Sequence, residues 1–439
     1  MNPTLPAAAV VDPATGVAPA AAVSAARANY ILLLVTLVYA VNFIDRNILN
    51  VLLQPIKEEF ALSDTMLGFM SGIGFTTLYV LASLPLARLA DRTNRVAVIC
   101  GGLTVWSAMT ALCGLAGSAT QLVLARCMVG VGEASSGGPG QAVLTDVFPP
   151  EKRARAMSVL STATFFGVLL AFVLGSAINA RHGWRAAFII VGLPGLLLAA
   201  LIWFTVREVP RGGAETKAVD LRPLGLAEVL RFLAGQRSVL LGTLAFSMSS
   251  FCSATIIAWV TPLLQRVHGL SNAQAGMRVG PILGLAGIAG GVIAALIMTR
   301  LSRRDMRWTL WATAASMLVA APAFVLFCFA PTPGIALAAL AVTTLCSGFQ
   351  IGPFVAALQS AVKVRMRALT GACNMAATTM LGWGLGPLAV GMLSDALQPR
   401  FGVDALRYAL LCGSLTLVIG AFLALRAARH LPGDIERCT

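Results

Sequence analysis

The chain has 439 residues, of which 58% are hydrophobic and 11% are charged, and its mean hydropathy is +0.83. Soluble globular proteins carry roughly 25% charged residues, so the composition excludes an ordinary soluble domain and indicates an integral membrane protein. The formal net charge of +14 would suggest a nucleic-acid partner in a soluble chain, but a membrane protein acquires it from basic loops on one face.

The first stretch, residues 1–28, is rich in Ala and Pro and is predicted to be a disordered tail. It has no basic residue before Arg27, so it lacks the positive start of a signal peptide. The nine cysteines are scattered through apolar segments without a C-x-x-C pair, which argues against a disulfide framework or a metal site. We therefore expect neither a metal nor a cofactor.

Twelve apolar segments follow, each of a length that suits a hydrocarbon core of about 30 Å. The fold class predicted is an all-α membrane protein with twelve transmembrane helices in two pseudo-symmetric six-helix halves. The N-terminal half is 29–206, the polar linker is 207–237, the C-terminal half is 238–428 and the tail is 429–439. The segments are 30–53, 67–89, 96–117, 121–143, 157–180, 185–206, 238–264, 274–299, 308–330, 334–358, 368–393 and 405–427.

The loops predict the orientation of the chain. With the N-terminus in the cytoplasm, about 23 basic residues lie inside and about 7 outside, as the positive-inside rule requires. Both termini are therefore expected in the cytoplasm. The absence of an N-x-S/T acceptor favours a bacterial inner membrane. Similar basic loops after the second and eighth segments, ARLADRTNR (87–95) and MTRLSRRDMR (298–307), suggest that the halves are repeats.

The first segment carries two adjacent charges, Asp45 and Arg46, well away from either end. A charge at membrane depth costs at least about 2.5 kcal/mol unless it is paired or faces a water-filled cavity. We therefore expect the other helices to build a polar interior around this pair.

The fourth segment carries Arg126 and Glu133, which are seven residues apart and so share one helix face. At 1.5 Å per residue, Arg126 lies about 8 Å and Glu133 about 18 Å below the outer surface, with Asp45 and Arg46 at roughly 10–12 Å. Asp45 is thus expected beside Arg126, with Arg46 reaching toward Glu133. The alternative is a static cluster of ion pairs that holds the two helices together. Buried ion pairs often give no net stabilisation, however, and charges within the membrane more often mark the route of an ion or substrate.

The loop 87–95, ARLADRTNR, is similar to the G-x-L-A-D-R-x-G-R signature of the major facilitator superfamily. Asp91, Arg92 and Arg95 match it. The resemblance implies that these residues close the cytoplasmic gate by pairing across the two halves, assisted by the helix dipole. Positive-inside topology alone would explain the arginines but not the aspartate.

Within the superfamily, NFIDRNIL (42–49), RCMVGVGEAS (126–135), GWRAAF (183–188) and 367–395 resemble the spinster-like branch. That branch moves lipid-like amphiphiles such as sphingosine phosphate and lysolipids, with proton coupling proposed. The resemblance implies a proton-coupled, alternating-access transporter with its proton site at Glu133 and Asp45 and with Arg46 and Arg126 as charge partners. A neighbouring branch of organic anion symporters shares the D-R pair and G-x-G-E-A, and is the alternative.

Other polar and aromatic residues are weaker candidates for the cavity wall: Tyr39, Asn42, Tyr79, Phe251, Trp259, Gln350, Asn374 and Trp383. A membrane enzyme is not expected, because no histidine lies inside a helix to serve as base or metal ligand. A receptor or channel is disfavoured by the repeat, which suits alternating access. The partners expected are an amphipathic or organic-anion substrate, protons and membrane lipid, with no nucleic acid, and the chain is expected to be a monomer.

Overall fold

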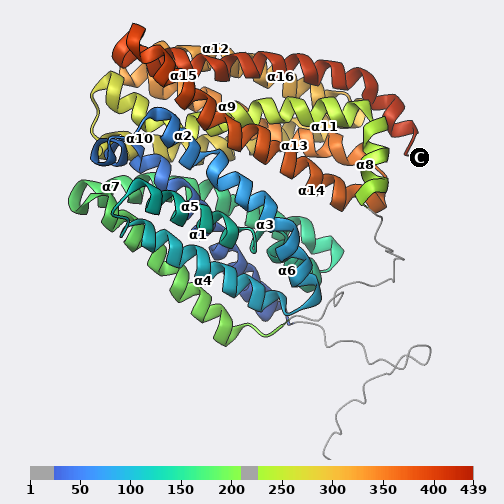
Figure 1. Cartoon of the computed structure of the whole chain (residues 1–439). Coiled ribbons are helices and arrows are strands. Elements are labelled where there is room, and N and C mark those ends of the chain that lie inside the picture. The colour runs from blue at the N-terminus through green and yellow to red at the C-terminus, as the bar shows by residue number, and fades with distance from the viewer. Residues whose placement is uncertain (1–23, 209–225, 439) are drawn as a thin grey trace, which may run out of the picture.

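The computed structural model describes residues 24–208 and 226–438, and most of the predicted tail 1–28 lies outside them. Two bundles of helices lie one above the other in Figure 1, the N-terminal half in blue to green and the C-terminal half in yellow to red. The described chain begins at Ser24, whose side chain accepts a hydrogen bond from the main-chain N–H of Arg27 and caps the first helix.

The N-terminal half crosses the membrane six times. α2 and α3 together make one span, α5 and α6 make another, and α7 divides into two spans at Gly183, whose φ of 80° suits glycine. The elements are α1 (Ala25–Phe60), α2 (Asp64–Ser71), α3 (Ile73–Arg92), α4 (Arg95–Cys113), α5 (Ala119–Glu133), α6 (Gly137–Val147) and α7 (Pro150–Thr205).

The C-terminal half also makes six crossings, preceded by the short helix α8. Two of its spans contain a π-helical turn, a feature that often lies at functional sites. The turns are Ile282–Ala286, between α10 and α11, and Thr379–Gly384, between α14 and α15. The helices are α8 (Leu226–Gly235), α9 (Arg237–His268), α10 (Asn272–Pro281), α11 (Gly287–Arg304), α12 (Trp308–Phe329), α13 (Pro333–Ser360), α14 (Arg367–Thr378), α15 (Leu385–Phe401) and α16 (Ala405–Glu436).

The predicted fold class is confirmed, with three local differences. The predicted fourth segment is interrupted by a turn at 134–136. Gly137, Gly138 and Pro139 follow it directly, and these residue types do not favour a helix that continues from the preceding one. The linker contains α8, an amphipathic helix that buries Val229 and Leu233. The final helix continues to Glu436, through most of the stretch expected to be a tail.

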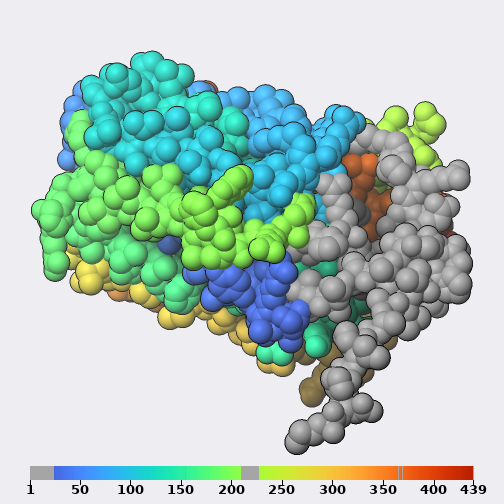
Figure 2. Space-filling view, turned by 90° about the horizontal axis from the view of Figure 1, so that it is seen from below, coloured from blue at the N-terminus to red at the C-terminus, as the bar shows by residue number. Residues whose placement is uncertain are grey.

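The two membrane faces differ in which helix ends they carry. We call the face where α1 begins, α3 meets α4 and α16 ends the basic face, and the other the opposite face. Both ends of the described chain lie toward the same side in Figure 1. Figure 2 shows the N-terminal half from below, with orange surface of the C-terminal half visible beyond the blue end of α3.

Polar contacts that join the halves gather at the opposite face. The buried carboxylate of Asp64 accepts two hydrogen bonds from Arg266 of α9, at 2.6 and 2.8 Å. It also accepts one from Ser394 of α15 at 2.7 Å and one from Lys57 at 2.5 Å. Asp395 accepts hydrogen bonds from the main-chain N–H of Asp64 at 3.0 Å and from Thr65 at 2.6 and 2.8 Å.

We call Lys57, Asp64, Arg266, Ser394 and Asp395 the opposite-face lock. Two of the helices that carry these residues also pack closely, since α2 lies against α15. Beside them, α10 of the C-terminal half packs against α7 of the N-terminal half. Asn272 of α10 adds a bond to the carbonyl oxygen of Val51 at 2.7 Å. The halves are therefore held together on the face away from both ends of the described chain.

Candidate functional site

The ion pair at the centre of the N-terminal half joins Arg46, in the middle of α1, to Glu133, the last residue of α5. The Nε and Nη2 atoms of Arg46 both donate to Oε2 of Glu133, at 3.0 and 2.8 Å. The Glu133 side chain is fully buried, whereas that of Arg46 is 19% exposed. The pairing predicted from helix depth is present, and the arginine is its accessible member.

Aromatic rings surround the guanidinium of Arg46. The ring centroids of Phe43, Phe75 and Tyr79 lie 5.5, 5.0 and 4.9 Å from its central carbon. A guanidinium is weakly hydrated and is attracted to aromatic faces, so this environment holds the charge without a second carboxylate. Tyr79 is among the sequence candidates, but Phe43 and Phe75 are not. The four-residue spacing of Phe75 and Tyr79 on one helix face is the signal that could have found Phe75.

Arg126 contacts the main chain of α1 beside Asp45. It is buried, and it donates to the main-chain carbonyl oxygen of Asp45 at 3.0 Å and to that of Arg46 at 3.3 Å. Both carboxylate oxygens of Asp45 are buried and make no hydrogen bond within the described residues. The four charges cluster as predicted and Asp45 lies beside Arg126, but the hydrogen bond is made to the main-chain carbonyl of Asp45 and not to its carboxylate. A carbonyl oxygen has two lone pairs, so a helix can offer acceptors that a charge count does not include.

Tyr39 and Asn42 lie on the same helix, one to two turns before Arg46. The hydroxyl of Tyr39 donates to the carbonyl oxygen of Gly137 at 2.8 Å and accepts from Gln141 at 3.4 Å. Tyr39 thus ties α1 to the start of α6, just after the break that follows Glu133. Asn42 is 6% exposed, and its amide nitrogen makes no hydrogen bond in the described part of the chain.

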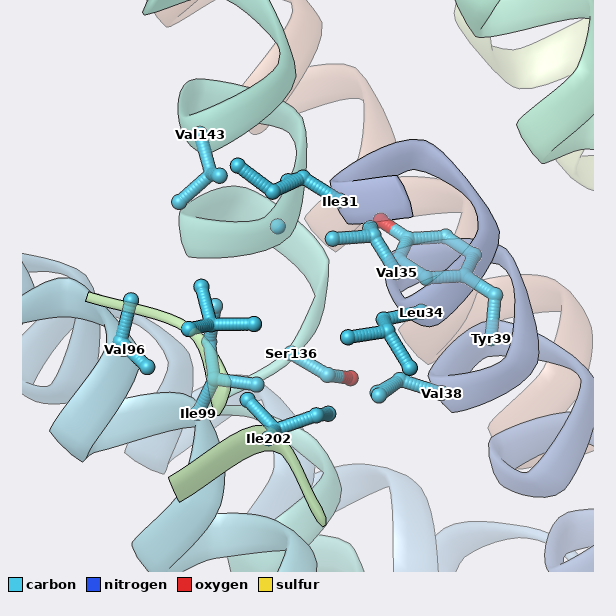
Figure 3. Close-up of a pocket in the computed structure, with 12 residues that line it drawn as sticks. Ile31, Leu34, Val35, Val38, Tyr39, Val96, Ile99, Ser136, Val143 and Ile202 are labelled. Carbon is cyan, nitrogen blue, oxygen red and sulfur yellow. The ribbon is translucent and has the colours of Figure 1, made fainter. Parts of the chain in front are cut away.

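A small apolar cavity lies near Tyr39, inside the N-terminal half. Figure 3 shows aliphatic side chains of α1 facing those of α4, α6 and α7 across it. Its volume is about 20 Å³, which is room for about one water molecule, and apolar cavities of this kind stay dry. It is therefore a packing space rather than a substrate route. The labelled lining residues are Ile31, Leu34, Val35, Val38, Tyr39, Val96, Ile99, Ser136, Val143 and Ile202.

The predicted gate residues lie where α3 ends and α4 begins, on the basic face. The side chain of Asp91 is 68% exposed and lies 3.5 Å from Arg95. Arg95 also pairs with Asp146 of α6, and Arg92 is the exposed last residue of α3. These contacts join elements of the N-terminal half, so the predicted pairing across the halves is not among them in this conformation.

The C-terminal half supplies neutral polar groups and no counterpart to the charge cluster. Its sequence has no Asp, Glu, Lys or Arg in 238–265, 279–299, 308–330, 333–360, 368–394 or 408–425. Gln350 is buried and accepts a hydrogen bond from Ser249. Trp259 is fully buried and donates to the carbonyl oxygen of Pro387 at 3.1 Å, which is a packing role.

The sequence profile described as Major Facilitator Superfamily matches residues 35–387. The chain belongs to this superfamily. A protein named MFS-type efflux pump from Mycolicibacterium smegmatis is 32% identical over 402 residues, which cover 91% of this chain and 92% of that protein. The sphingosine-1-phosphate transporter SPNS2 of Danio rerio is 27% identical and covers 90% of this chain and 83% of that protein.

A solved structure supports the same placement within the superfamily. It is titled as a bacterial homologue of the human lysosomal transporter spinster in an inward-facing, unoccupied conformation. It superposes with a TM-score of 0.86 at 28% identity, covering 94% of this chain and 99% of that one. The chain is thus a spinster-like member of a transporter superfamily and not an enzyme. Within the described residues, no group of three His, Cys, Asp or Glu side chains could hold a metal ion.

Proposed function

We propose that this spinster-like transporter is proton-coupled and moves an amphipathic substrate with an anionic headgroup, of the lysolipid or sphingosine-phosphate type, by alternating access. It would act in a bacterial inner membrane with both termini in the cytoplasm, as the loop charges favour. The observation that carries the proposal is the pairing of a partly exposed Arg46 with a fully buried Glu133.

In the proposed coupling step, Glu133 and the anionic headgroup of the substrate compete for the guanidinium of Arg46. Arg46 can form a bidentate contact with a phosphate or carboxylate, as it already shares two of its donors with Glu133. When an anionic headgroup takes Arg46, Glu133 is left as a buried charge without its partner. Such a charge is costly in a low-dielectric interior, and the carboxylate takes a proton instead. Proton binding and substrate binding are thereby linked.

The amphipathic nature of the substrate is supported by the surroundings of Arg46. The aromatic rings around it offer apolar contact beside the charge, and the facing half of the molecule carries neutral side chains. The name of the zebrafish relative supports a phosphorylated lipid, and that of the mycobacterial relative favours export.

Because the opposite face is closed, we infer that this conformation takes up its substrate from the basic face. The opposite-face lock joins the halves there, and the solved structure with the TM-score of 0.86 is described as inward-facing. A substrate would then reach Arg46 from the face on which α1 begins. The lock would have to break for release on the other side.

Flux measurements in proteoliposomes test the proposal. The purified chain is reconstituted, a pH gradient is imposed, and movement of a labelled lysophosphatidylglycerol is followed beside that of a labelled small monocarboxylate. We expect gradient-driven movement of the lysolipid that is lost in Glu133→Gln. Movement of the monocarboxylate alone would favour the organic anion alternative, and flux of the lysolipid through Glu133→Gln at the wild-type rate would rule out the coupling step.

A further inference from the structure

A second polar site lies at the basic face of the C-terminal half, away from the charge cluster. It is a pocket of about 530 Å³ between the end of α8, the start of α9 and the end of α16. The charged and titratable residues that line it are Arg237, Arg429, His430, Asp434 and Arg437. No other pocket residue carries a charge, so basic groups predominate.

Arg237 and Arg429 are available to bind a ligand, whereas Arg437 and Asp434 already bind other parts of the protein. The buried Asp434 accepts from the main-chain N–H of Ser238 at 2.7 Å and lies 3.4 Å from Arg437. Arg437 also donates to the carbonyl oxygen of Gly235 at 3.0 Å, so these two side chains stabilise the junction of α8, α9 and α16. Arg237 and Arg429 are exposed and have no ion pair within the described residues.

The pocket lies at the edge of the lipid-facing surface. On α9, the exposed Leu240 and Leu244 follow Arg237 by three and seven residues and share its helix face. On α16, the exposed Phe422 and Leu425 precede Arg429 by seven and four residues. At 1.5 Å per residue, each arginine lies about 4.5–6 Å along the helix axis from the nearest exposed leucine of the same helix. We place the boundary between hydrocarbon and headgroups here, because the exposed side chains change from apolar to basic.

The neighbouring helix α8 also suits a membrane interface. It buries Val229 and Leu233 against the C-terminal half and exposes Leu230, and it ends at Gly235, two residues before Arg237. Figure 1 shows α8 beside the end of α16, at the side where the described chain ends. A short amphipathic helix in this position lies in the plane of the headgroups.

We propose that this pocket binds the phosphate of an anionic phospholipid from the leaflet at the basic face, with the acyl chains lying along the apolar stripes of α9 and α16. These two helices pack against each other, so one lipid can contact both. Basic pockets between membrane helices are suited to anionic headgroups. The site shares no residue with the Arg46–Glu133 cluster and does not depend on what the protein transports.

Lipid titration of the full chain tests the proposal. The protein is purified in a neutral detergent and titrated with phosphatidylglycerol, phosphatidylcholine or glycerol phosphate, and bound adducts are counted by native mass spectrometry. Arg237→Gln with Arg429→Gln removes both unpaired charges and spares Arg437 and Asp434. Arg303→Gln with Arg304→Gln removes two exposed arginines from the end of α11 and is the charge-matched control.

We expect phosphatidylglycerol to bind more tightly than phosphatidylcholine. The pocket variant should bind phosphatidylglycerol about 30-fold more weakly, which is about fivefold for each arginine removed. The control variant should bind like the wild type, and both variants should keep the lipid-free melting temperature. Equal losses in the two variants would mean general surface attraction and would overturn the site. Equal binding of the two lipids, or glycerol phosphate binding as tightly as the lipid, would overturn it as well.

Discussion

Arg126 donates hydrogen bonds to the main-chain carbonyl oxygens of Asp45 and Arg46, at 3.0 and 3.3 Å. Arg126 therefore binds the main chain of α1 at Arg46, the residue whose side chain makes the ion pair with Glu133. Arg126 and Glu133 both belong to α5, so this helix holds Arg46 at its backbone and at its guanidinium. The arrangement fixes the position of α1 against α5 while leaving the Arg46 guanidinium able to exchange its partner.

Arg126→Lys should impair transport while leaving the Arg46–Glu133 pair in place. A lysine keeps the charge but lacks the planar fork that reaches two carbonyl groups, so one acceptor loses its donor. We expect the transport rate to fall about tenfold, the effect of one charged hydrogen bond of about 1.5 kcal/mol. Flux in proteoliposomes is the measurement. An unchanged rate would mean that the second carbonyl contact does not position Arg46.

Arg46→Ala should abolish substrate binding, because the accessible charge and its aromatic contacts are lost together. Arg46→Lys should restore binding only in part, since an ammonium cannot form the bidentate contact. Glu133→Gln should still bind, because Arg46 remains. Substrate-induced stabilisation of the purified protein against heating reports binding in each variant. Full binding by Arg46→Ala would remove Arg46 from the substrate site.

Asp64→Asn should open the opposite face. Removing the charge from a buried pair typically costs about 3 kcal/mol, which is more than about a hundredfold in an equilibrium between conformations. Distances between spin labels on the outer ends of α2 and α15 should lengthen. Lys57→Met is the matched control, because Asp64 keeps both bonds to Arg266. If the control opens the face as far as Asp64→Asn does, the Arg266 contact is not the main element of the lock.

Gly68→Ala should disfavour the same closed face by steric overlap. A Cβ atom added to Gly68 would overlap the carbonyl oxygen of Pro387 on α15. The two helices would have to separate, so we expect a shift toward the conformation open at the opposite face. Gly101→Ala is the control, since a Cβ there meets no atom within 4 Å. Labels on α2 and α15 measure both, and no separation in Gly68→Ala would show that the close approach is dispensable.

Asp91→Asn should shift the population toward the conformation open at the basic face. Here Asp91 is largely exposed and lies 3.5 Å from Arg95, and exposed pairs contribute at most about 1 kcal/mol. Its larger effect is therefore expected in the alternate conformation, where the halves meet at the basic face. Labels on the inner ends of α3 and α14 report the change. Unchanged distances would exclude a latch role for Asp91.

Helix depth was enough to predict that Arg46 reaches Glu133, because 1.5 Å per residue places the two charges within reach. It could not predict the acceptors of Arg126, since every helical residue offers a carbonyl oxygen and packing decides which are exposed. Phe43 and Phe75 were not predicted, for a similar reason. Phenylalanine is common in membrane helices, and the sequence does not show which rings lie against a charged group.

The opposite-face lock was the largest feature outside the sequence predictions. Lys57 and Arg266 are two of the few basic residues expected outside, and Asp64 is not among the predicted site residues. Their meeting depends on how the two halves dock, which sequence spacing within one half does not report. The twelve crossings, by contrast, follow from local hydropathy and were predicted.

The formal charges of Asp45, Arg46, Arg126 and Glu133 sum to zero. With the four groups ionised, the empty protein moves no net charge from this cluster when it changes conformation. One added proton makes the cluster a monovalent cation, whose passage through the full field is worth about 2.3 kcal/mol per 100 mV. A monoanionic headgroup bound beside that proton restores neutrality. Under the proposed proton coupling, the current recorded across a planar bilayer during turnover, compared with the flux of labelled substrate, gives the net charge moved with each substrate.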